Sequence, residues 1–211
     1  MTGVTAAGDD ERLAVLHDLA ILDTPAEPAY DDIARLASAS CGSRIAAVNF
    51  VERHRHWTKA ICGVPGGQGA SVAVERSLCA ATIATDGGLL SIPDMLADAR
   101  WSAHPDVTGG ARLRFYAGAA IVVADQPIGV VCVFGDEPRP ITEADEHALA
   151  VLARQVATHL ELRTRNVELR ELLVRDELIL NAVGEGICRI DGDGFITVSY
   201  THLTLPTIYS V

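Results

Sequence analysis

The sequence has little of several features that mark specialised classes of protein. None of its uncharged apolar stretches is long enough to cross a bilayer, and the opening residues MTGVTAAGDDER lack the basic region and apolar core of a secretory signal. Basic residues are scarce: 17 Lys and Arg against 28 Asp and Glu give a net charge of −11. A field of that sign repels nucleic acid and anionic membranes. We therefore expect a cytoplasmic protein with neither nucleic acid nor membrane as a partner.

Cysteine is sparse and is not arranged for cross-linking or for zinc. The five residues are odd in number, widely spaced and never form a Cys-x-x-Cys motif: Cys41, Cys62, Cys79, Cys132 and Cys188. His54 and His56 fall in a predicted turn, with no carboxylate or cysteine at the spacing of a tetrahedral site. We expect reduced thiols that are mostly buried, no disulfide framework and no metal.

What is present is a mixed pattern of helices and strands. Apolar residues at helical spacing predict helices over 11–22, 29–40, 77–88 and 142–180, the last opening on a Thr-x-x-Asp capping box. Apolar, β-branched runs predict strands over 44–52, 56–64, 89–95, 115–123 and 127–135. The segment 96–114 is too polar and broken for regular structure, and loops of that length are commonly functional. The order predicts the α+β class with an antiparallel sheet.

Several ordered motifs carry a resemblance to a known family. LHDLAILDTPAEPAYDDIARLAS, HWTKA, SLCAATI, LLSIPDMLADARWSAHPDV, RFYAGA and PIGVVCVFGDEPRPIT follow one another with the order and spacing of bacterial GAF sensory domains, which precede histidine kinase or diguanylate cyclase modules. The resemblance covers about residues 11–165. It implies a six-stranded antiparallel sheet flanked by helices, and a ligand pocket roofed by the long loop.

The resemblance also implies which residues line that pocket. The predicted ligand-binding residues are Trp57, Lys59, Cys79, Asp94, Trp101, His104, Arg114, Phe115 and Tyr116. Aromatic rings beside a few convergent polar groups are typical of ligand sites, and the two cations predict a small, partly anionic ligand. Two alternatives stay open: Arg114 forms a salt bridge with Asp94 or Asp98, and the tryptophans are packing residues.

The residues favour a binding domain over an enzyme or a photosensor. Bilin-binding GAF domains attach the chromophore through a Cys followed by His, and cyclic-nucleotide-binding members carry an Asn-Lys signature; neither dipeptide occurs here, so no cofactor is expected. Free methionine sulfoxide reductases have the GAF fold, and Cys62 and Cys79 lie near two of the three cysteines of that family. The third, attacking cysteine would fall in 104–110, where there is none. The reductase remains the alternative to a non-catalytic domain.

The C-terminal part of the helix expected over 142–180 predicts an interface with a second copy of the chain. Heptad spacing runs through Leu162, Asn166, Leu169 and Leu173, so we expect a homodimer through a coiled-coil signalling helix over 161–180, with Asn166 specifying the register. The alternative is a single amphipathic helix that lies back along its own domain.

The C-terminal residues change in character after Thr197. ELILNAVGEGICRIDGDGFIT resembles the opening hairpin of a PAS domain, whereas Val198–Val211 contains no charged residue and VSYTHL resembles translated sequencing-adapter sequence. We interpret the chain as a truncated fragment. It divides into a disordered N-terminus (1–10), a GAF domain (11–160), the signalling helix (161–180), a PAS start (181–197) and an artefactual tail (198–211). The expected function is regulation of a missing output domain, a histidine kinase or a diguanylate cyclase/phosphodiesterase.

Overall fold

The computed structural model describes residues 6–182, 187–190 and 196–200. Its helices are α1 (Ala6–Asp18), α2 (Pro28–Ser40), α3 (Leu78–Ile83), α4 (Pro105–Thr108) and α5 (Glu143–Ala182). Its strands are β1 (Ile45–Val51), β2 (Arg55–Cys62), β3 (Ser71–Ala73), β4 (Leu89–Ile92), β5 (Phe115–Val123), β6 (Gln126–Gly135), β7 (Ile187–Ile190) and β8 (Ile196–Tyr200). The chain forms two compact units, Met1–Glu161 and Leu162–Val211, and the first contains the large sheet.

Six strands form one antiparallel sheet in the order β3-β2-β1-β6-β5-β4, which confirms the predicted fold class. β1 is central, and all seven of its residues are buried. β3 follows the glycine-rich segment after β2, and it pairs only with the first residues of β2. Gly63 makes the turn out of β2 possible. Its φ is +84°, and a Cβ there would lie 2.1 Å from the carbonyl oxygen of Arg44.

A β-bulge in β2 fixes the direction of an important side chain. The register pairs Thr58 with Asn49 and Ala60 with Val48, so Lys59 is the extra residue on β2. A bulge bends its strand and re-aims the side chains around it. Here it allows both Trp57 and Ala60 to contribute to the same core cluster.

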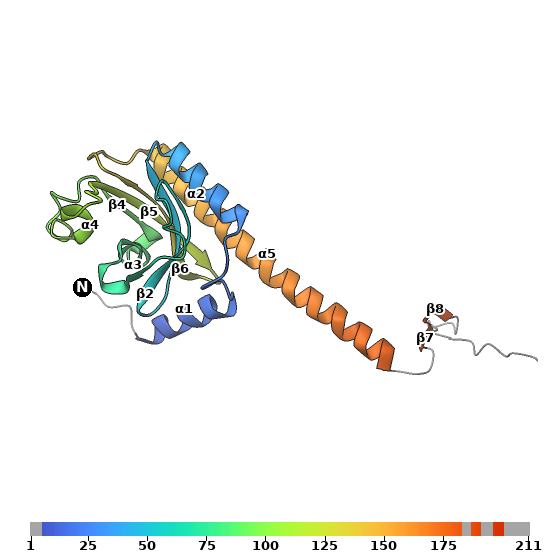
Figure 1. Ribbon diagram of the computed structural model, residues 1–211. Coiled ribbons are helices and arrows are strands. Elements are labelled where there is room, and N and C mark those ends of the chain that lie inside the picture. The colour runs from blue at the N-terminus through green and yellow to red at the C-terminus, as the bar shows by residue number, and fades with distance from the viewer. Residues whose placement is uncertain (1–5, 183–186, 191–195, 201–211) are drawn as a thin grey trace, which may run out of the picture. The chain divides into compact units, whose positions relative to one another are not determined.

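The sheet separates two apolar cores (Figure 1). On one side, called the helix face, α1, α2 and the first part of α5 cover the sheet with residues such as Leu16, Ala34 and Val156. On the other side, called the loop face, α3, α4 and the segment 93–114 cover it with residues such as Met95 and Val107. Successive side chains of a strand point to opposite faces, so Phe115 and Tyr116 belong to different cores.

The helix boundaries confirm some expectations and correct others. Residues 6–10 were expected to be disordered, but they are helical, since they form the first part of α1. The capping box of α5 is confirmed: the Thr142 amide donates to the Asp145 carboxylate at 3.1 Å, and the Asp145 amide donates to the Thr142 hydroxyl at 3.1 Å. The long loop contains a turn of helix, α4, which starts with Pro105 at a position where its missing N–H costs nothing.

The C-terminal region contains a separate hairpin. β7 and β8 pair antiparallel, and β8 runs through the boundary expected at Thr197, because Val198, Ser199 and Tyr200 all have partners on β7. A single hairpin is too small to identify a domain, so the PAS interpretation stays a prediction. The rest of the expected tail, 201–211, lies outside the described residues, as do 1–5 of the expected N-terminal region.

Candidate functional site

The structure does not bring the nine predicted ligand-binding residues together. Trp57, Lys59 and Phe115 lie on the helix face, among the residues that pack under α2 and α5. Asp94 and Arg114 form an ion pair at the partly exposed edge of the loop face. Four of the nine lie under the loop face: Cys79 and Tyr116 are buried in its core, the partly buried Trp101 packs against that core, and the buried His104 contacts Trp101.

Lys59 is a structural cation. Its ammonium donates to the Thr24 hydroxyl at 2.7 Å, to the Pro25 carbonyl at 2.7 Å and to the Glu27 carboxylate at 2.6 Å. The side chain is fully buried. A buried charge is tolerated when it is paired and fully hydrogen-bonded, and all three donors of Lys59 are used. Lys59 therefore anchors the segment between α1 and α2, and the expectation that it attracts an anionic ligand is not supported.

Arg114 forms a salt bridge, which was the alternative to a ligand contact. Its guanidinium donates twice to the Asp94 carboxylate, at 2.9 and 2.8 Å, which is the bidentate geometry that favours a well-defined pair. This hydrogen bonding lowers the pKa of Asp94 from its ordinary 3.8. The pair joins the end of β4 to the start of β5, while Asp98 pairs with Arg100 instead. The second cation expected in the pocket is thus neutralised by its own domain.

His104 is also held by the protein. Its Nε2 lies 2.8 Å from the Arg76 carbonyl, and its Nδ1 accepts a hydrogen bond from the Asp106 amide at 3.2 Å, so the ring is the tautomer protonated on Nε2. The ring packs edge-on against Trp101, with 5.9 Å between centroids. The residue therefore caps α4 and fixes it next to the segment that precedes α3.

His56 differs from the sequence expectation. Instead of pointing outward from a turn, it lies on β2 and is half-buried, with Nδ1 2.6 Å from the Ser77 hydroxyl. Burial lowers its pKa to about 4, so the ring is neutral at physiological pH. Ser77 also caps α3 by accepting from the Ala80 amide. The pair fixes the start of α3 against the sheet edge.

The centre of the loop face is a buried polar cluster. It consists of Asn49 on β1, Cys79 and Thr82 on α3, Tyr116 on β5 and Cys132 on β6. The Asn49 amide nitrogen lies 3.3 Å from the Cys79 sulfur and 3.4 Å from the Cys132 sulfur. The hydroxyls of Thr82 and Tyr116 are 2.6 Å apart. A buried polar network stabilises a fold only when each of its donors and acceptors has a partner, so each polar atom of this cluster has to be accounted for.

Gly118 gives Tyr116 the room to reach that cluster. A Cβ at Gly118 would lie 2.5 Å from the Tyr116 hydroxyl and 2.9 Å from a methyl carbon of Val130. The Tyr116 ring also packs against Phe134 with 5.2 Å between centroids. Burial, with the nearby Cys79 as a further cause, raises the pKa of Tyr116, so the phenol remains protonated and acts as a hydrogen-bond donor or acceptor.

Two buried polar atoms of the loop face have no hydrogen-bond partner among the described residues. They are the side-chain oxygen of Asn49 and the indole nitrogen of Trp101. Most buried polar atoms in native proteins are satisfied, and a buried acceptor or donor without a partner costs about 1–3 kcal/mol. Asn49 was not among the predicted site residues. Its signal in the sequence is that it is the one polar residue in the apolar run IAAVNFV.

The thiols of the reductase alternative lie apart. Cys62 packs against the core of the helix face, and Cys79 is in the core of the loop face. The sheet stands between them. A reaction that passes a disulfide from one to the other has no support in this arrangement. Within the part of the chain that the structure describes, no group of three or more His, Cys, Asp or Glu side chains could hold a metal.

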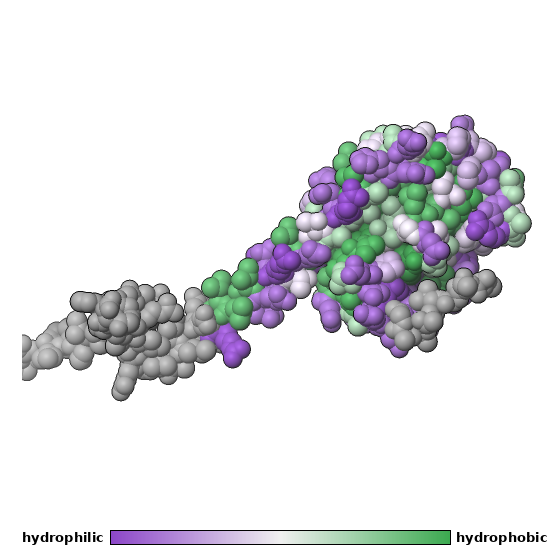
Figure 2. Space-filling model, turned by 180° about the vertical axis from the view of Figure 1, so that it is seen from behind, coloured by the Kyte–Doolittle hydropathy of each residue, from purple (hydrophilic) through white to green (hydrophobic). Residues whose placement is uncertain are grey.

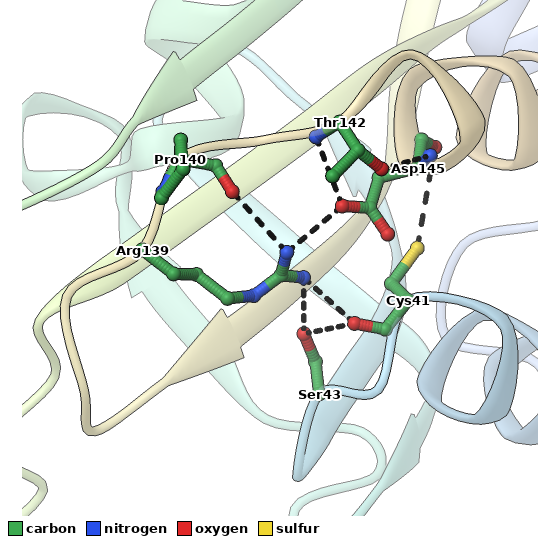
Figure 3. A network of polar contacts seen from close by, with 6 residues as sticks. All are labelled: Cys41, Ser43, Arg139, Pro140, Thr142 and Asp145. Atoms are coloured by element: carbon green, nitrogen blue, oxygen red, sulfur yellow. Dashed lines mark hydrogen bonds and ion pairs between the residues drawn. The ribbon is translucent and has the colours of Figure 1, made fainter.

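A polar network joins the sheet to the start of α5 (Figure 3). Arg139 donates to the Asp145 carboxylate at 2.8 Å, to the Cys41 carbonyl at 2.7 Å and to the Ser43 hydroxyl at 3.3 Å. Its guanidinium lies 4.2 Å from the centroid of the Phe115 ring. Its amide donates to the carbonyl of Pro93, directly after β4. One residue thus links the loop-face segment, the end of α2 and the first turn of α5.

The second half of α5 exposes a series of apolar side chains (Figure 2). The predicted seam residues Leu162, Leu169 and Leu173 are all at least half exposed, up to 65% for Leu173. Asn166, also on the seam, donates to the carbonyl of Leu162 one turn earlier. None of the described helices has the length and apolar character needed to cross a membrane.

Comparison with known proteins assigns the family. The family description "GAF domain" matches residues 25–160, which is more than half of the chain. The chain belongs to the GAF domain family. This agrees with the six-stranded antiparallel sheet and the helices that flank it.

Three similar proteins show how far the similarity of this chain extends. A cyclic di-GMP phosphodiesterase of Pseudomonas aeruginosa is 30% identical over 161 residues, which are 75% of this chain but only 27% of that protein. The GAF domain of an Acinetobacter phosphoenolpyruvate-protein phosphotransferase matches with a TM-score of 0.56 and 12% identity, over 80% of this chain and 99% of that one. The PixJ GAF domain of Thermosynechococcus elongatus matches with a TM-score of 0.54 and 13% identity, over 82% and 96%. At such identities the two structures show the fold alone.

Proposed function

We propose that the chain is a non-catalytic sensory and regulatory domain of a bacterial signal-transduction protein. It would bind a small molecule under the loop face and regulate an output domain through α5. Support comes from its membership of the GAF family and from the similarity to a cyclic di-GMP phosphodiesterase of which this chain matches about a quarter. A phosphodiesterase output is therefore the form of the proposal that we favour.

The observation that carries the proposal is the pair of unpartnered polar atoms in the loop-face core. Asn49 offers a buried acceptor within the polar cluster, and Trp101 offers a buried donor beside the apolar residues of the same face. Ligand sites are typically apolar with a few placed polar groups. A bound molecule that donates to Asn49 and accepts from Trp101 would remove the cost of leaving both unsatisfied.

The charges of the site favour a neutral ligand. The two cations that suggested an anion, Lys59 and Arg114, are paired with Glu27 and Asp94. The buried His104 donates to a backbone carbonyl rather than facing a free site. A small uncharged molecule that carries both a donor and an acceptor suits these groups better than a carboxylate or phosphate does.

The route to an output domain runs through Arg139. The loop-face segment binds the Arg139 backbone at Pro93, and the Arg139 side chain binds the first turn of α5 at Asp145. A ligand regulates only if its affinity differs between two states of the domain. We propose that these states differ in how the start of α5 packs. The exposed seam of Leu162, Leu169 and Leu173 would make α5 a dimer contact that carries the change onward.

A thermal-shift screen tests the ligand proposal. The full chain and its Asn49→Leu variant are melted with pools of uncharged metabolites, and Asn166→Leu serves as the control because it makes the same substitution on α5. A compound at roughly 100 Kd stabilises the native state by about 2.7 kcal/mol, or about 5–11 °C for a domain of this size. We expect a shift for the wild type and for Asn166→Leu, and none for Asn49→Leu. No shift with any pool, or an equal shift in all three proteins, would reject the loop-face site.

A further inference from the structure

The loop-face core holds two thiols that the proposed function does not use. Cys79 on α3 and Cys132 on β6 are 53 residues apart in the sequence, yet both are buried in the same apolar core. Both sulfurs also lie within 3.4 Å of the same Asn49 amide nitrogen. Because both sulfurs contact the same nitrogen atom, they are neighbours in the core, and a disulfide requires a local movement that brings them to ~2.05 Å.

The surroundings make the two thiols unequal. The neighbouring Cys132 side chain lowers the pKa of Cys79, with Asn49 adding to the effect against the opposing influence of burial. Burial and the same contact with Cys79 raise the pKa of Cys132. Thiolate is the reactive form of cysteine. This difference favours Cys79 as the attacking thiol and Cys132 as the thiol that resolves it.

We propose that Cys79 and Cys132 form an oxidation site, in which a small peroxide closes a disulfide between α3 and β6. The Cys79 thiolate attacks the O–O bond of hydrogen peroxide, which gives the Cys79 sulfenic acid and hydroxide. The Cys132 sulfur then attacks the sulfenic sulfur, the S–S bond forms and a second hydroxide leaves. The two thiol protons convert both hydroxides to water. Two electrons pass from the sulfurs to the peroxide, and the chain loses two hydrogen atoms.

The other described thiols do not share this arrangement. Cys41 is buried alone beside the Asp145 carbonyl, and burial raises its pKa to about 11. Cys62 lies on the opposite face of the sheet from Cys79. The pairing is thus specific to the one place where two thiols and an amide donor converge.

The disulfide would change the candidate ligand site without any ligand. Asn49 would lose a thiolate acceptor, and α3 would be tied to β6, the strand that leads to Arg139 and α5. Since the Asn49 oxygen is also the proposed ligand acceptor, oxidation and ligand binding would act on the two ends of the same amide. This consequence rests on the proposed function, whereas formation of the disulfide does not.

Peptide mapping tests the oxidation site directly. The full chain with Cys188→Ser is treated with hydrogen peroxide, unfolded, alkylated to block remaining thiols and digested without reductant, and the peptides are identified by mass spectrometry. We expect a cross-linked peptide containing Cys79 and Cys132, lighter by two hydrogen atoms than the reduced pair, with Cys41 and Cys62 alkylated. Cys41→Ser should retain the cross-link. In Asn49→Leu, which lacks the shared donor, the disulfide should form about tenfold more slowly, since one such hydrogen bond is worth about 1.4 kcal/mol.

A second arm separates a native site from general cysteine oxidation. The same chain is oxidised in urea, where short-range pairs such as Cys62 with Cys79 are expected to be favoured, because shorter loops close at lower entropic cost. The proposal is upheld if the Cys79–Cys132 link dominates in the native protein only. It is overturned if both thiols are alkylated after native peroxide treatment, or if the native and unfolded proteins give the same mixture of links. Either result is read on the unmutated pair, so it does not depend on whether a serine variant folds.

Discussion

Replacing Arg139 with methionine should show how strongly the sheet holds the start of α5. The substitution keeps an apolar stem of similar length over Phe115, but removes the donors to Asp145, Cys41 and Ser43. Asp145 remains buried, with 8% of its side chain exposed. Its carboxylate then has only the Thr142 amide as a partner among the contacts described above.

The size of the effect follows from the burial of the two partners. Removing one member of a buried ion pair costs about 3–5 kcal/mol, because the other charge is left uncompensated. The Arg139 side chain is 30% exposed, so solvent screens part of this interaction and we reduce the expectation to about 2–3 kcal/mol. For a domain of this size, that loss corresponds to a decrease of about 4–12 °C in Tm.

The effect should depend on pH in a defined direction. Burial acts to raise the pKa of Asp145, but hydrogen bonds from Arg139 and Thr142 outweigh it and hold the pKa below its ordinary 3.8. A carboxyl group with a lowered folded pKa stabilises the protein above the unfolded pKa, and that stabilisation is lost as pH falls through the folded pKa. The difference between wild type and Arg139→Met should therefore be complete above about pH 5 and shrink as the pH falls below 3.8.

Urea denaturation of the full chain at a series of pH values measures this difference. Arg35→Met is the control, because the Arg35–Asp32 pair has the same chemistry but both side chains are more than 60% exposed, and it should leave the midpoint unchanged. Arg139→Lys keeps the charge without the planar fork and should give an intermediate loss. An Arg139→Met variant as stable as the wild type at neutral pH, or a difference that does not vary with pH, would refute the reasoning.

Three further predictions concern other parts of the chain. Gly118→Ala should destabilise the domain by about 1–3 kcal/mol in urea melts, because the new methyl group overlaps the Tyr116 hydroxyl; an unchanged midpoint would contradict this. Light scattering should give a dimer for residues 1–182 and a weaker dimer or monomer for 1–160, and equal masses would reject α5 as the interface. With free methionine sulfoxide and a thioredoxin recycling system, NADPH consumption should equal the blank, and turnover abolished by Cys79→Ser would favour the reductase instead.

Much of the fold was predictable because it depends on local patterns. The apolar runs of β1, β5 and β6, and the reciprocal Thr142–Asp145 cap, are determined by residues near one another in the sequence. β3 was missed because it is a three-residue edge strand after several glycines, and it pairs only with the start of β2. Turn chemistry dominates such a segment, and pairing appears only once the neighbouring strand is in place.

The candidate site was harder to predict because it depends on which face each residue occupies. Alternation already implies that Phe115 and Tyr116 point to opposite sides of the sheet. Assigning Trp57 to the same side as Phe115 also needs the register between strands, including the bulge at Lys59. The meeting of Cys79, Cys132 and Asn49 joins three distant segments and has no local signal except one asparagine in an apolar strand.

The central claim, that the loop face is the sensing face, is tested most directly by the two tryptophans of the chain. Trp101 packs against the loop-face core and Trp57 lies in the helix-face core, so Trp57→Phe and Trp101→Phe each leave one reporter on a known side of the sheet. Fluorescence is recorded while a compound that raises the Tm of the wild type is added to each variant. The account predicts a saturable change in Trp57→Phe, where Trp101 reports, and little change in Trp101→Phe. A change seen only through Trp57 would place the ligand on the helix face and contradict the account.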